Sequence, residues 1–376
     1  MYIPQEQLKN LNSFLQPQKA VIIYGSRRCG KTTLLNEILK SIKEKYLLVN
    51  GEDITVQEYL SSQSIEKLKS FVGDNKLLLI DEAQKIKNIG LNIKLLLDNV
   101  DMLKIVAAGS SSFDLAQQIG EPLTGRKYTL KMFPLAQLEL NKIQNKIEVD
   151  SSLEQRLVYG SYPEVVLIKD NTKRILYLKE IVNSYLYKDI LELEGIRHSD
   201  KLVRLLQLLA FQIGKEVSFN EFGQQLGMSK NTVDRYFDLL EKSFVIFKLK
   251  GFSRNLRKEI SKNPRYYFYD IGIRNTLINN FNSLSMRNDI GMLWENYIII
   301  ERIKKQEYLG INANNYFWRT YDQKEIDFVE ERQGKLYGYE IKWSNDKHKL
   351  PKEWLETYKD SEFNIITKEN YLTFIT

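Results

Sequence analysis

The chain has 376 residues, of which 43% are hydrophobic and 27% are charged, a balance typical of a globular protein with about two or three domains. Its net charge of +7 gives mild attraction to polyanions and does not distinguish nucleic acid from nucleotide. The single cysteine, Cys29, excludes an intramolecular disulfide and favours a reducing compartment. The N-terminus lacks a basic-then-apolar signal pattern, and no apolar run approaches the ~20 residues of a membrane span. We therefore expect a cytoplasmic protein with no membrane partner.

The first part of the chain, residues 1–140, alternates short apolar runs with stretches of helical spacing. The apolar runs lie at residues 20–24, 46–49, 77–80, 104–108 and 128–133. This alternation predicts an α/β domain with a parallel sheet and crossover helices. A polar stretch at residues 141–152 predicts the domain boundary that follows.

A complete phosphate-binding loop follows the first apolar run. We expect nucleotide contacts from Gly25, Ser26, Arg27, Arg28, Cys29, Gly30, Lys31, Thr32 and Thr33. A polyphosphate needs backbone N–H donors at a helix N-terminus, a cation that reaches the outer phosphates, and a hydroxyl on Mg²⁺. The glycines allow the loop, Lys31 supplies the cation and Thr32 supplies the hydroxyl. The pattern therefore predicts a P-loop NTPase domain that binds a nucleoside triphosphate with Mg²⁺.

Two acids at the end of the third apolar run predict hydrolysis. Residues 77–80 read as a buried strand that ends in Asp81 and Glu82, and ligands bind at the carboxyl edge of parallel strands. We expect Asp81 to hold Mg²⁺ through water. Glu82, which alternation points the other way, is expected to orient or deprotonate the attacking water. The fourth run leads into Gly109 and Ser110, and we expect the Ser110 hydroxyl to sense the γ-phosphate.

The middle part, residues 153–280, has mostly helical spacing. Residues 218–240 read as a helix-turn-helix, with Gly227 in the turn and Ser229 capping the second helix. Candidates for contact with double-stranded DNA on that second helix are Lys230, Asn231, Thr232 and Arg235. Folds of this type also serve as protein-interaction modules, and two aspartates on the same helix would repel phosphates. Both interpretations stay open.

Two strand-like runs, at residues 244–249 and 265–269, follow the helix pair like the strands of a wing. They predict a winged helix-turn-helix. Basic side chains gather in the same region, at Arg254, Arg257, Lys258, Lys262 and Arg265. A solvated surface is the ordinary explanation of such a cluster, and contact with DNA phosphates is the sharper alternative.

The last part, residues 285–376, has a long helical run followed by short strands. Alternation places Asp327 on one strand, and Glu340 with Lys342 on one face of the next. An acid followed by acid-x-lysine on adjacent strands is a metal-nuclease arrangement, in which the carboxylates hold Mg²⁺ and the lysine positions water or offsets charge on the phosphate. Glu295 on the preceding helix adds another carboxylate. The alternative is a pair of amphipathic strands with solvated charges.

Several of these motifs together resemble a known family. They are residues 24–35, 79–84, 109–112 and 123–126 in the first part, and residues 160–164, 267–272, 318–320, 325–328 and 340–342 in the rest. With them the chain resembles the bacterial and archaeal AAA-type ATPases that carry an uncharacterised C-terminal domain. The resemblance implies an ATPase core of the additional-strand, catalytic-glutamate class. A winged helix and a small α/β restriction-endonuclease-like domain of the PD-(D/E)XK type would follow it.

The resemblance also gives a role to Arg126. The family's Gly-Arg pair, here Gly125 and Arg126, implies an arginine sensor or finger on the γ-phosphate of its own or a neighbouring subunit, and in the second case a homo-oligomer. Two positions depart from the family pattern. Ser26 stands where proline is more usual, and Ile326 precedes Asp327 where the nuclease pattern has a proline.

The sequence thus predicts an Mg²⁺-dependent ATPase that couples nucleotide state to a DNA-associated C-terminal module. Three functions fit this prediction. The last domain cleaves DNA, or it is a dead nuclease scaffold within a nucleotide-controlled DNA-binding switch. In the third, a regulatory ATPase of the signalling kind uses its helix-turn-helix and last domain to meet proteins.

Overall fold

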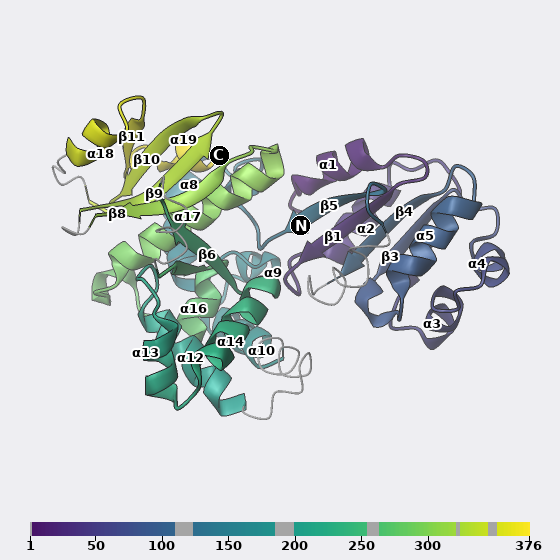
Figure 1. Cartoon of the computed structure of the whole chain (residues 1–376), viewed down its shortest axis with the longest axis horizontal. Helices are drawn as coiled ribbons and strands as arrows, with labels where there is room; N and C mark the ends of the chain where they lie inside the picture. Colours follow the sequence, from purple (N-terminus) through teal and green to yellow (C-terminus); the bar gives the residue numbers. More distant parts are fainter. Residues whose placement is uncertain (1, 110–122, 185–198, 254–262, 321–323, 345–351) are drawn as a thin grey trace. The chain divides into compact units, whose positions relative to one another are not determined.

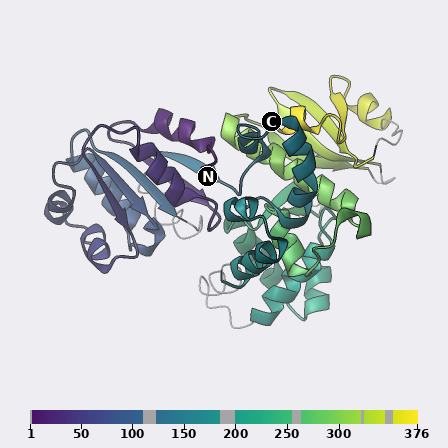
Figure 2. The ribbon, with the colours of Figure 1, turned by 180° about the vertical axis from the view of Figure 1, so that it is seen from behind.

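The computed structural model describes residues 2–109, 123–184, 199–253, 263–320, 324–344 and 352–376, and these form two compact units (Figure 1). The first unit comprises residues 2–135 together with residues 242–244. The second comprises residues 136–241 together with residues 245–376. Figure 2 shows the same ribbon from behind.

A five-stranded parallel sheet forms the centre of the first unit. Its strands, in spatial order, are β2 (Tyr46–Asn50), β3 (Leu77–Asp81), β4 (Lys104–Gly109), β1 (Ala20–Gly25) and β5 (Lys127–Met132). Each of the five predicted apolar runs is one of these strands, which confirms the predicted α/β fold with a parallel sheet. Strand β4 lies between β1 and β3.

Helices cover the faces of this sheet (Figure 1). They are α1 (Gln7–Phe14), α2 (Lys31–Leu39), α3 (Ile54–Leu60), α4 (Ile65–Val72), the 3₁₀ turn η1 (Ala83–Lys85) and α5 (Ile89–Asn99). All residues of β1 and β3 are buried, and a strand covered on both faces is a continuous apolar run for this reason. Leu34 and Ile38 of α2 share a core cluster with Val21 and Leu79 of the sheet, so the helix after the phosphate-binding loop is packed firmly.

The second unit contains a six-stranded sheet. Its strands, in spatial order, are β11 (Glu362–Ile366), β10 (Lys335–Ile341), β9 (Glu325–Arg332), β8 (Asn314–Arg319), β6 (Ile246–Gly251) and β7 (Arg265–Phe268). Its helices are α7 (Gln137–Leu140), α8 (Lys146–Tyr159), α9 (Pro163–Leu167), α10 (Asn171–Ile181), α12 (Ser199–Phe211), α13 (Phe219–Leu226), α14 (Lys230–Lys242), α16 (Ile271–Leu277), η3 (Leu284–Met286), α17 (Ile290–Leu309), α18 (Lys352–Thr357) and α19 (Tyr371–Ile375). Helix α17 is buried along most of its length against β10 and α19.

The predicted helix pair is present as α13 and α14. Gly227 between them has a φ of 60°, a left-handed conformation that glycine adopts without strain. The Ser229 hydroxyl accepts a hydrogen bond from the Thr232 backbone N–H at 3.1 Å, which is the predicted cap of the second helix. Phe222 and Val233 are buried in a shared core, so hydrophobic contact between the two helices holds the turn.

Two features concern the residues around the predicted domain boundaries. Strand β6 pairs antiparallel with β7 and, through Lys250 and Gly251, parallel with β8, so residues predicted as a wing belong to the sheet of the last domain. Residues 136–241 and 245–376 belong to one compact unit, and the division into domains at 153–280 and 285–376 stays a prediction. The polar stretch 141–152 is also more than a linker, because Asn145 and Glu148 form a capping box that starts α8.

Among the residues that the structure describes, none of the helices combines the length and the apolar character that a membrane crossing requires.

Candidate nucleotide and carboxylate sites

Two glycines shape the phosphate-binding loop between β1 and α2. A Cβ on Gly25 would lie 2.3 Å from the Met132 carbonyl oxygen of the neighbouring strand, so only glycine fits there. Gly30 is the N-cap of α2 and has a φ of 101°, which L-residues rarely adopt. The loop thus brings the N–H groups of the first turn of α2 to the carboxyl edge of the sheet, where an anion binds favourably.

Lys31 lies inside this loop. Its side chain is 5% exposed, and its Nζ donates hydrogen bonds to the carbonyl oxygens of Gly25 at 2.9 Å and Ser26 at 2.8 Å. These bonds aim the ammonium at the loop that the sequence predicts to cradle phosphates. A charged donor held this way needs little reorganisation to meet phosphate oxygens.

The two predicted Mg²⁺ ligands lie in contact. Thr32 Oγ1 on α2 donates a hydrogen bond to Asp81 Oδ2 at the end of β3, at 2.6 Å. The Glu82 backbone N–H donates to the other carboxylate oxygen, Asp81 Oδ1, at 3.0 Å. The structure therefore brings together a hydroxyl and a carboxylate from elements far apart in sequence, and such hard oxygen atoms suit Mg²⁺.

Glu82 is oriented by a backbone turn. The sequence prediction assigned its direction by strand alternation, but β3 ends at Asp81 and Glu82 has a φ of 48°, in the left-handed region. Alternation does not apply beyond the strand end, so that part of the reasoning was wrong. The Glu82 carboxylate accepts a hydrogen bond from Gln84 Nε2, and this bond holds its direction next to Asp81.

Sequence reasoning missed two residues that support this edge. Gly51 follows β2, and its N–H donates to the Asp81 carbonyl at 2.8 Å; a Cβ there would lie 2.4 Å from the Glu82 carbonyl oxygen. Buried Gln5 donates through Nε2 to the Gly30 carbonyl at 3.2 Å. A glycine directly after a strand signals a tight turn, whereas nothing in the sequence links Gln5 to the loop.

Arg126 lies at the opposite edge of the sheet. The Ala20 backbone N–H donates to the Arg126 carbonyl at 2.9 Å, and β5 runs from there to Met132, which pairs with Gly25 at the phosphate edge. Five residues of strand span about 17 Å. The prediction that Arg126 senses the γ-phosphate of its own subunit is therefore wrong. Its guanidinium forms an ion pair with Asp98. The predicted sensor Ser110 lies outside the described residues.

The residues predicted for a nuclease site converge in the second unit. Lys342 Nζ lies 2.6 Å from Glu340 Oε1 and 3.6 Å from Asp327 Oδ2. Asp327 Oδ2 also accepts the Ile341 backbone N–H at 2.8 Å. Glu295 of α17 joins the group, since burial and the repulsion of Asp327 raise its pKa to about 8. These four side chains therefore form one group, in which Asp327 is buried and Glu295, Glu340 and Lys342 are half-buried.

Two residues of β7 complete this group, and sequence reasoning did not place them there. Arg265 Nη2 lies 2.6 Å from Glu325 Oε2, and its Nη1 lies 3.9 Å from Glu295 Oε1. The Tyr267 hydroxyl donates to Glu295 Oε1 at 2.6 Å. Arg265 is 5% exposed, so its assignment to a basic surface cluster was wrong. Arg265 and Tyr267 alternate onto one face of a strand, but this pattern does not indicate which carboxylates they contact.

Burial is the largest influence on the pKa values of the three acids in this group. Burial raises the pKa of Asp327 above its usual value, and burial with the charge of Asp327 raises that of Glu340. Burial opposes the charged form of Lys342, but Asp327 and Glu340 outweigh it and raise the lysine pKa. Across the described part of the chain, no three or more His, Cys, Asp or Glu side chains are arranged to hold a metal ion. The predicted Mg²⁺ ligands are instead bridged by an ammonium.

The candidate DNA contacts on α14 separate into two kinds. Lys230, Asn231 and Arg235 are exposed on this helix, as predicted. Thr232 is half-buried, and its Oγ1 is 2.8 Å from Ser229 Oγ, so it serves the helix cap. The candidates Arg254, Arg257 and Lys258 lie outside the described residues.

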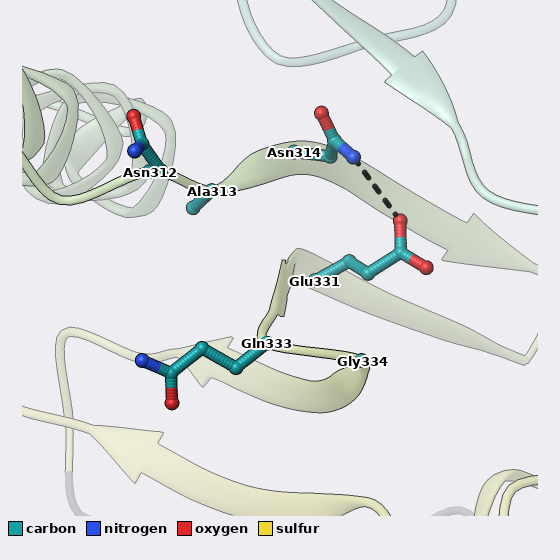
Figure 3. A pocket seen from close by; sticks show the side chains of 6 residues that line it. All are labelled: Asn312, Ala313, Asn314, Glu331, Gln333 and Gly334. Carbon is teal, nitrogen blue, oxygen red and sulfur yellow. Dashed lines mark hydrogen bonds between the residues drawn. The ribbon is translucent and has the colours of Figure 1, made fainter.

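A surface hollow of about 410 Å³ lies elsewhere in the second unit, where the ends of β8, β9 and β10 meet (Figure 3). It is lined by Asn312, Ala313, Asn314, Glu331, Gln333 and Gly334. Asn314 Nδ2 donates to Glu331 Oε2 at 3.3 Å across it. None of the predicted site residues lines this hollow, so it is separate from the carboxylate group.

Family models match three successive parts of the chain. Residues 17–141 match a family described as an AAA domain. Residues 150–284 match a domain of unknown function, DUF8612, and residues 290–372 match another, DUF4143. The chain is therefore similar to AAA domains over residues 17–141 and to DUF4143 domains over residues 290–372.

Individual proteins are similar to the chain over different lengths. An uncharacterized protein of Mycobacterium tuberculosis is 27% identical over 340 residues, which are 88% of this chain and 72% of that protein. A proteasome-associated ATPase of Catenulispora acidiphila is 27% identical over 108 residues, which are 28% of this chain and 18% of that protein. A solved Walker-type ATPase of Pyrococcus abyssi aligns with a TM-score of 0.48 at 16% identity, covering 74% of this chain and 96% of that one.

Proposed function

We propose that this chain hydrolyses ATP with Mg²⁺ in its first unit and uses the cycle to control a DNA-associated second unit. The contact of 2.6 Å between the Thr32 hydroxyl and the Asp81 carboxylate supports the first step most directly. It sets a pair of oxygen ligands at the sheet edge where Lys31 and the first turn of α2 face a bound anion.

The loop residues suit a magnesium-bound triphosphate. Ser26 Oγ is buried and has no hydrogen-bond partner in the described part of the chain, so the loop offers a donor that a phosphate oxygen would satisfy. Lys31 exchanges its bonds to the Gly25 and Ser26 carbonyls for bonds to phosphate. Thr32 and Asp81 hold the metal, and bound Mg²⁺ supplies positive charge to the outer phosphates.

Glu82 orients and deprotonates the attacking water, and Gln84 holds the Glu82 carboxylate in place. Glu82→Gln removes the base and keeps the size of the side chain. We expect the Kd for MgATP to stay within about threefold, while turnover falls by at least about 100-fold. Phosphate release and titration with a fluorescent nucleotide measure the two quantities. Glu52→Gln, an exposed acid in the same unit, is the matched control, and unchanged turnover in Glu82→Gln would refute the role of this residue.

Arg126 acts on the nucleotide of a neighbouring subunit. Arg126 lies at the sheet edge away from the phosphate-binding loop of its own subunit. As an arginine finger it would therefore contact the nucleotide of a neighbouring subunit. The ion pair with Asp98 holds the guanidinium until a neighbour docks. A homo-oligomer follows from this assignment.

The second unit carries a candidate nuclease site. The chain runs from α17 through the antiparallel strands β8, β9 and β10 to α18 and the parallel strand β11, an order that supports a restriction-endonuclease-like domain. The convergence of Glu295, Asp327, Glu340 and Lys342 supports an active site at the predicted position. A plasmid-nicking assay with Mn²⁺ compares wild type with Lys342→Ala, and equal nicking by both rejects cleavage at this site.

DNA contact through α14 is the accompanying proposal, with α13, α14 and the β6–β7 hairpin as a winged helix-turn-helix. Fluorescence anisotropy with duplex DNA tests it on the double variant Lys230→Ala, Arg235→Ala, which we expect to bind with lower affinity and a shallower salt dependence. The control changes Lys173 and Lys179, exposed lysines of α10, to alanine. If wild type has no salt-dependent affinity for DNA, the unit meets proteins instead.

Coupling between the two activities rests on residues 242–244. They pack with the first unit, where Phe244 meets Phe133 edge-on with ring centres 6.1 Å apart. Helix α14 ends at Lys242 and β6 begins at Ile246. A change in the ATPase core therefore has a covalent route to both the DNA-facing helix and the β6–β7 hairpin.

A further inference from the structure

The sheet of the first unit has two edge strands, β5 and β2, and β5 is protected against pairing. The Arg126 carbonyl accepts a hydrogen bond from the β1 side. Alternation therefore directs the backbone groups of Lys127, Thr129 and Lys131 towards the free edge. Two of these three residues are lysines, which on an edge strand discourage pairing with another chain. Gln7 Nε2 also donates to the Lys131 carbonyl at 2.8 Å.

Strand β2 at the other edge lacks this protection. On the β3 side, the Lys45 carbonyl accepts a hydrogen bond and the Gly51 N–H donates one. Alternation therefore directs the backbone groups of Tyr46, Leu48 and Asn50 away from β3. Among the described residues, the backbone N–H and carbonyl groups of Tyr46 and Leu48 have no hydrogen-bond partner. These two residues are 45% and 40% exposed, and no residue of β2 is charged. An open, apolar edge strand is a template for pairing with another strand.

Strand β2 is complementary to a second copy of itself. In an antiparallel pair centred on Leu48, this residue lies opposite Leu48 of the other copy, and Tyr46 lies opposite Asn50. The three outward residues then all occupy hydrogen-bonded positions, where opposite residues exchange both backbone bonds. Their side chains lie on one face of the joined sheet, so Leu48 packs beside Leu48 of the other copy. A two-fold axis relates the two halves of such a contact.

Charges at the two ends of β2 favour the antiparallel direction. Lys43 and Lys45 precede the strand, and Glu52 and Asp53 follow it. Antiparallel pairing sets the basic start of one strand beside the acidic end of the other. Parallel pairing would set basic residues against basic residues and acids against acids, which is unfavourable.

Contacts within the chain leave these charges able to pair across the interface. Lys45 Nζ lies 2.6 Å from Asp74 Oδ1, and both side chains are more than half exposed, so this ion pair contributes little. Glu44, an acid at the basic start, has its Oε1 2.7 Å from Lys104 Nζ, so its charge is already compensated. Within the described part of the chain, Glu52 forms no ion pair.

We propose that β2 is an interface between two copies of this chain, which pair antiparallel along this edge and join their five-stranded sheets into one. The match of the outward backbone groups and the opposite charges at the two strand ends favour a second copy over a strand of another protein. The contact lies at the opposite edge of the sheet from β5, so it is separate from the contact proposed for Arg126. It involves none of the residues proposed to bind nucleotide.

Sedimentation velocity of the whole chain over a range of concentrations tests the pairing. We expect wild type to form a dimer. Leu48→Lys sets two like charges opposite each other across the two-fold axis and removes an apolar contact, so we expect it to raise the Kd of the dimer by at least about tenfold. Thr129→Lys is the matched control, because Thr129 is the exposed middle residue of the outward row on β5. We expect it to leave the Kd within about twofold.

Leu48→Cys gives a second test that adds no charge to the edge. The Cα atoms of a hydrogen-bonded antiparallel pair are about 5.5 Å apart, a separation that a disulfide spans. The native Cys29 is buried, so mild oxidation of the folded dimer is expected to link two chains through position 48. Thr129→Cys is the control and is expected to stay unlinked. Gel electrophoresis without reductant measures the linked fraction.

Three outcomes would overturn the proposal. Wild type that stays monomeric at the highest soluble concentration leaves the edge to a strand of another protein. A dimer with the same Kd in Leu48→Lys as in wild type is held together elsewhere. A dimer that Leu48→Lys weakens but Leu48→Cys does not link has another register than the one centred on Leu48. Dimerisation without any binding of MgATP would contradict the proposed ATPase activity and leave the pairing of β2 intact.

Discussion

Substitution of Gly51 tests the geometry at the carboxyl edge of the sheet, where Asp81 and Glu82 lie. Its amide donates to the Asp81 carbonyl at 2.8 Å. A Cβ at this position would lie 2.4 Å from the Glu82 carbonyl oxygen and 3.2 Å from that of Asp81. Both neighbours are backbone atoms, which have no rotamer to escape into. Gly51→Ala must therefore separate β2 from the end of β3 by more than about 0.6 Å to relieve the contact.

That displacement acts on the residue that activates water. We expect turnover of ATP to fall by about 10- to 100-fold, since shifts approaching 1 Å in a catalytic group have effects of this size. The free energy of unfolding should fall by about 1–3 kcal/mol. The Kd for MgATP should change less than turnover, because Lys31 and the first turn of α2 belong to the loop between β1 and α2, whereas Gly51 contacts the backbone of Asp81 and Glu82.

Steady-state phosphate release, nucleotide titration and thermal melting give the three quantities. Gly291→Ala is the control, since a Cβ at Gly291 meets nothing within 4 Å. Turnover of Gly51→Ala within twofold of wild type would show that the position of Glu82 does not govern hydrolysis.

Two further predictions test other parts of the account. If Arg126 acts on the nucleotide of a neighbouring subunit, Arg126→Ala should reduce turnover by about 10³-fold. Mixing Arg126→Ala with Glu82→Gln should restore part of the activity, because the Glu82→Gln subunit supplies an intact Arg126 to the intact Glu82 site of the other variant. A mixture no more active than its components contradicts this. Arg274 and Arg287 hold the pKa of Asp289 at about 2, so this carboxylate stabilises the fold above pH 4 and the effect fades as the pH falls from 4 to 2. Asp289→Asn should lower the free energy of unfolding, measured by chemical denaturation, by about 3 kcal/mol at pH 7 and by much less at pH 2. An equal loss at both pH values would show that the stabilisation by Asp289 does not come from its charge.

The sheet of the first unit was predictable because its signals are local. Strands β1 and β3 are buried on both faces and so appear as unbroken apolar runs. The phosphate-binding loop was readable from spacing, since Gly25 and Gly30 sit where a close backbone approach and a φ of 101° require glycine. The contact of Thr32 with Asp81 followed from the rule that parallel strands end at one edge.

What the sequence missed depends on pairing between distant segments. Arg265 belongs to the carboxylate group because β6 pairs with β8, and no local pattern announces a strand shared between two predicted domains. The predicted direction of the Glu82 side chain was wrong because its backbone is left-handed, so the alternation of the strand ends before it. The error on Arg126 could have been avoided from the sequence. Arg126 precedes the apolar run at 128–133, and the residue before a parallel strand lies at the amino edge of the sheet. Its distance from the phosphate-binding loop therefore follows from the order of residues alone.

The central claim is that the first unit clamps the phosphates of ATP with Lys31 and the first turn of α2. Isothermal titration calorimetry of the whole chain with MgATP tests it, comparing wild type with Lys31→Met. The Lys31 ammonium holds two carbonyls that it exchanges for phosphate oxygens, and losing such a charged contact costs about 3 kcal/mol. We predict saturable binding by wild type and a Kd about 100-fold higher in the variant. Folded wild type that takes up no MgATP, or equal Kd values for the two proteins, would contradict the claim.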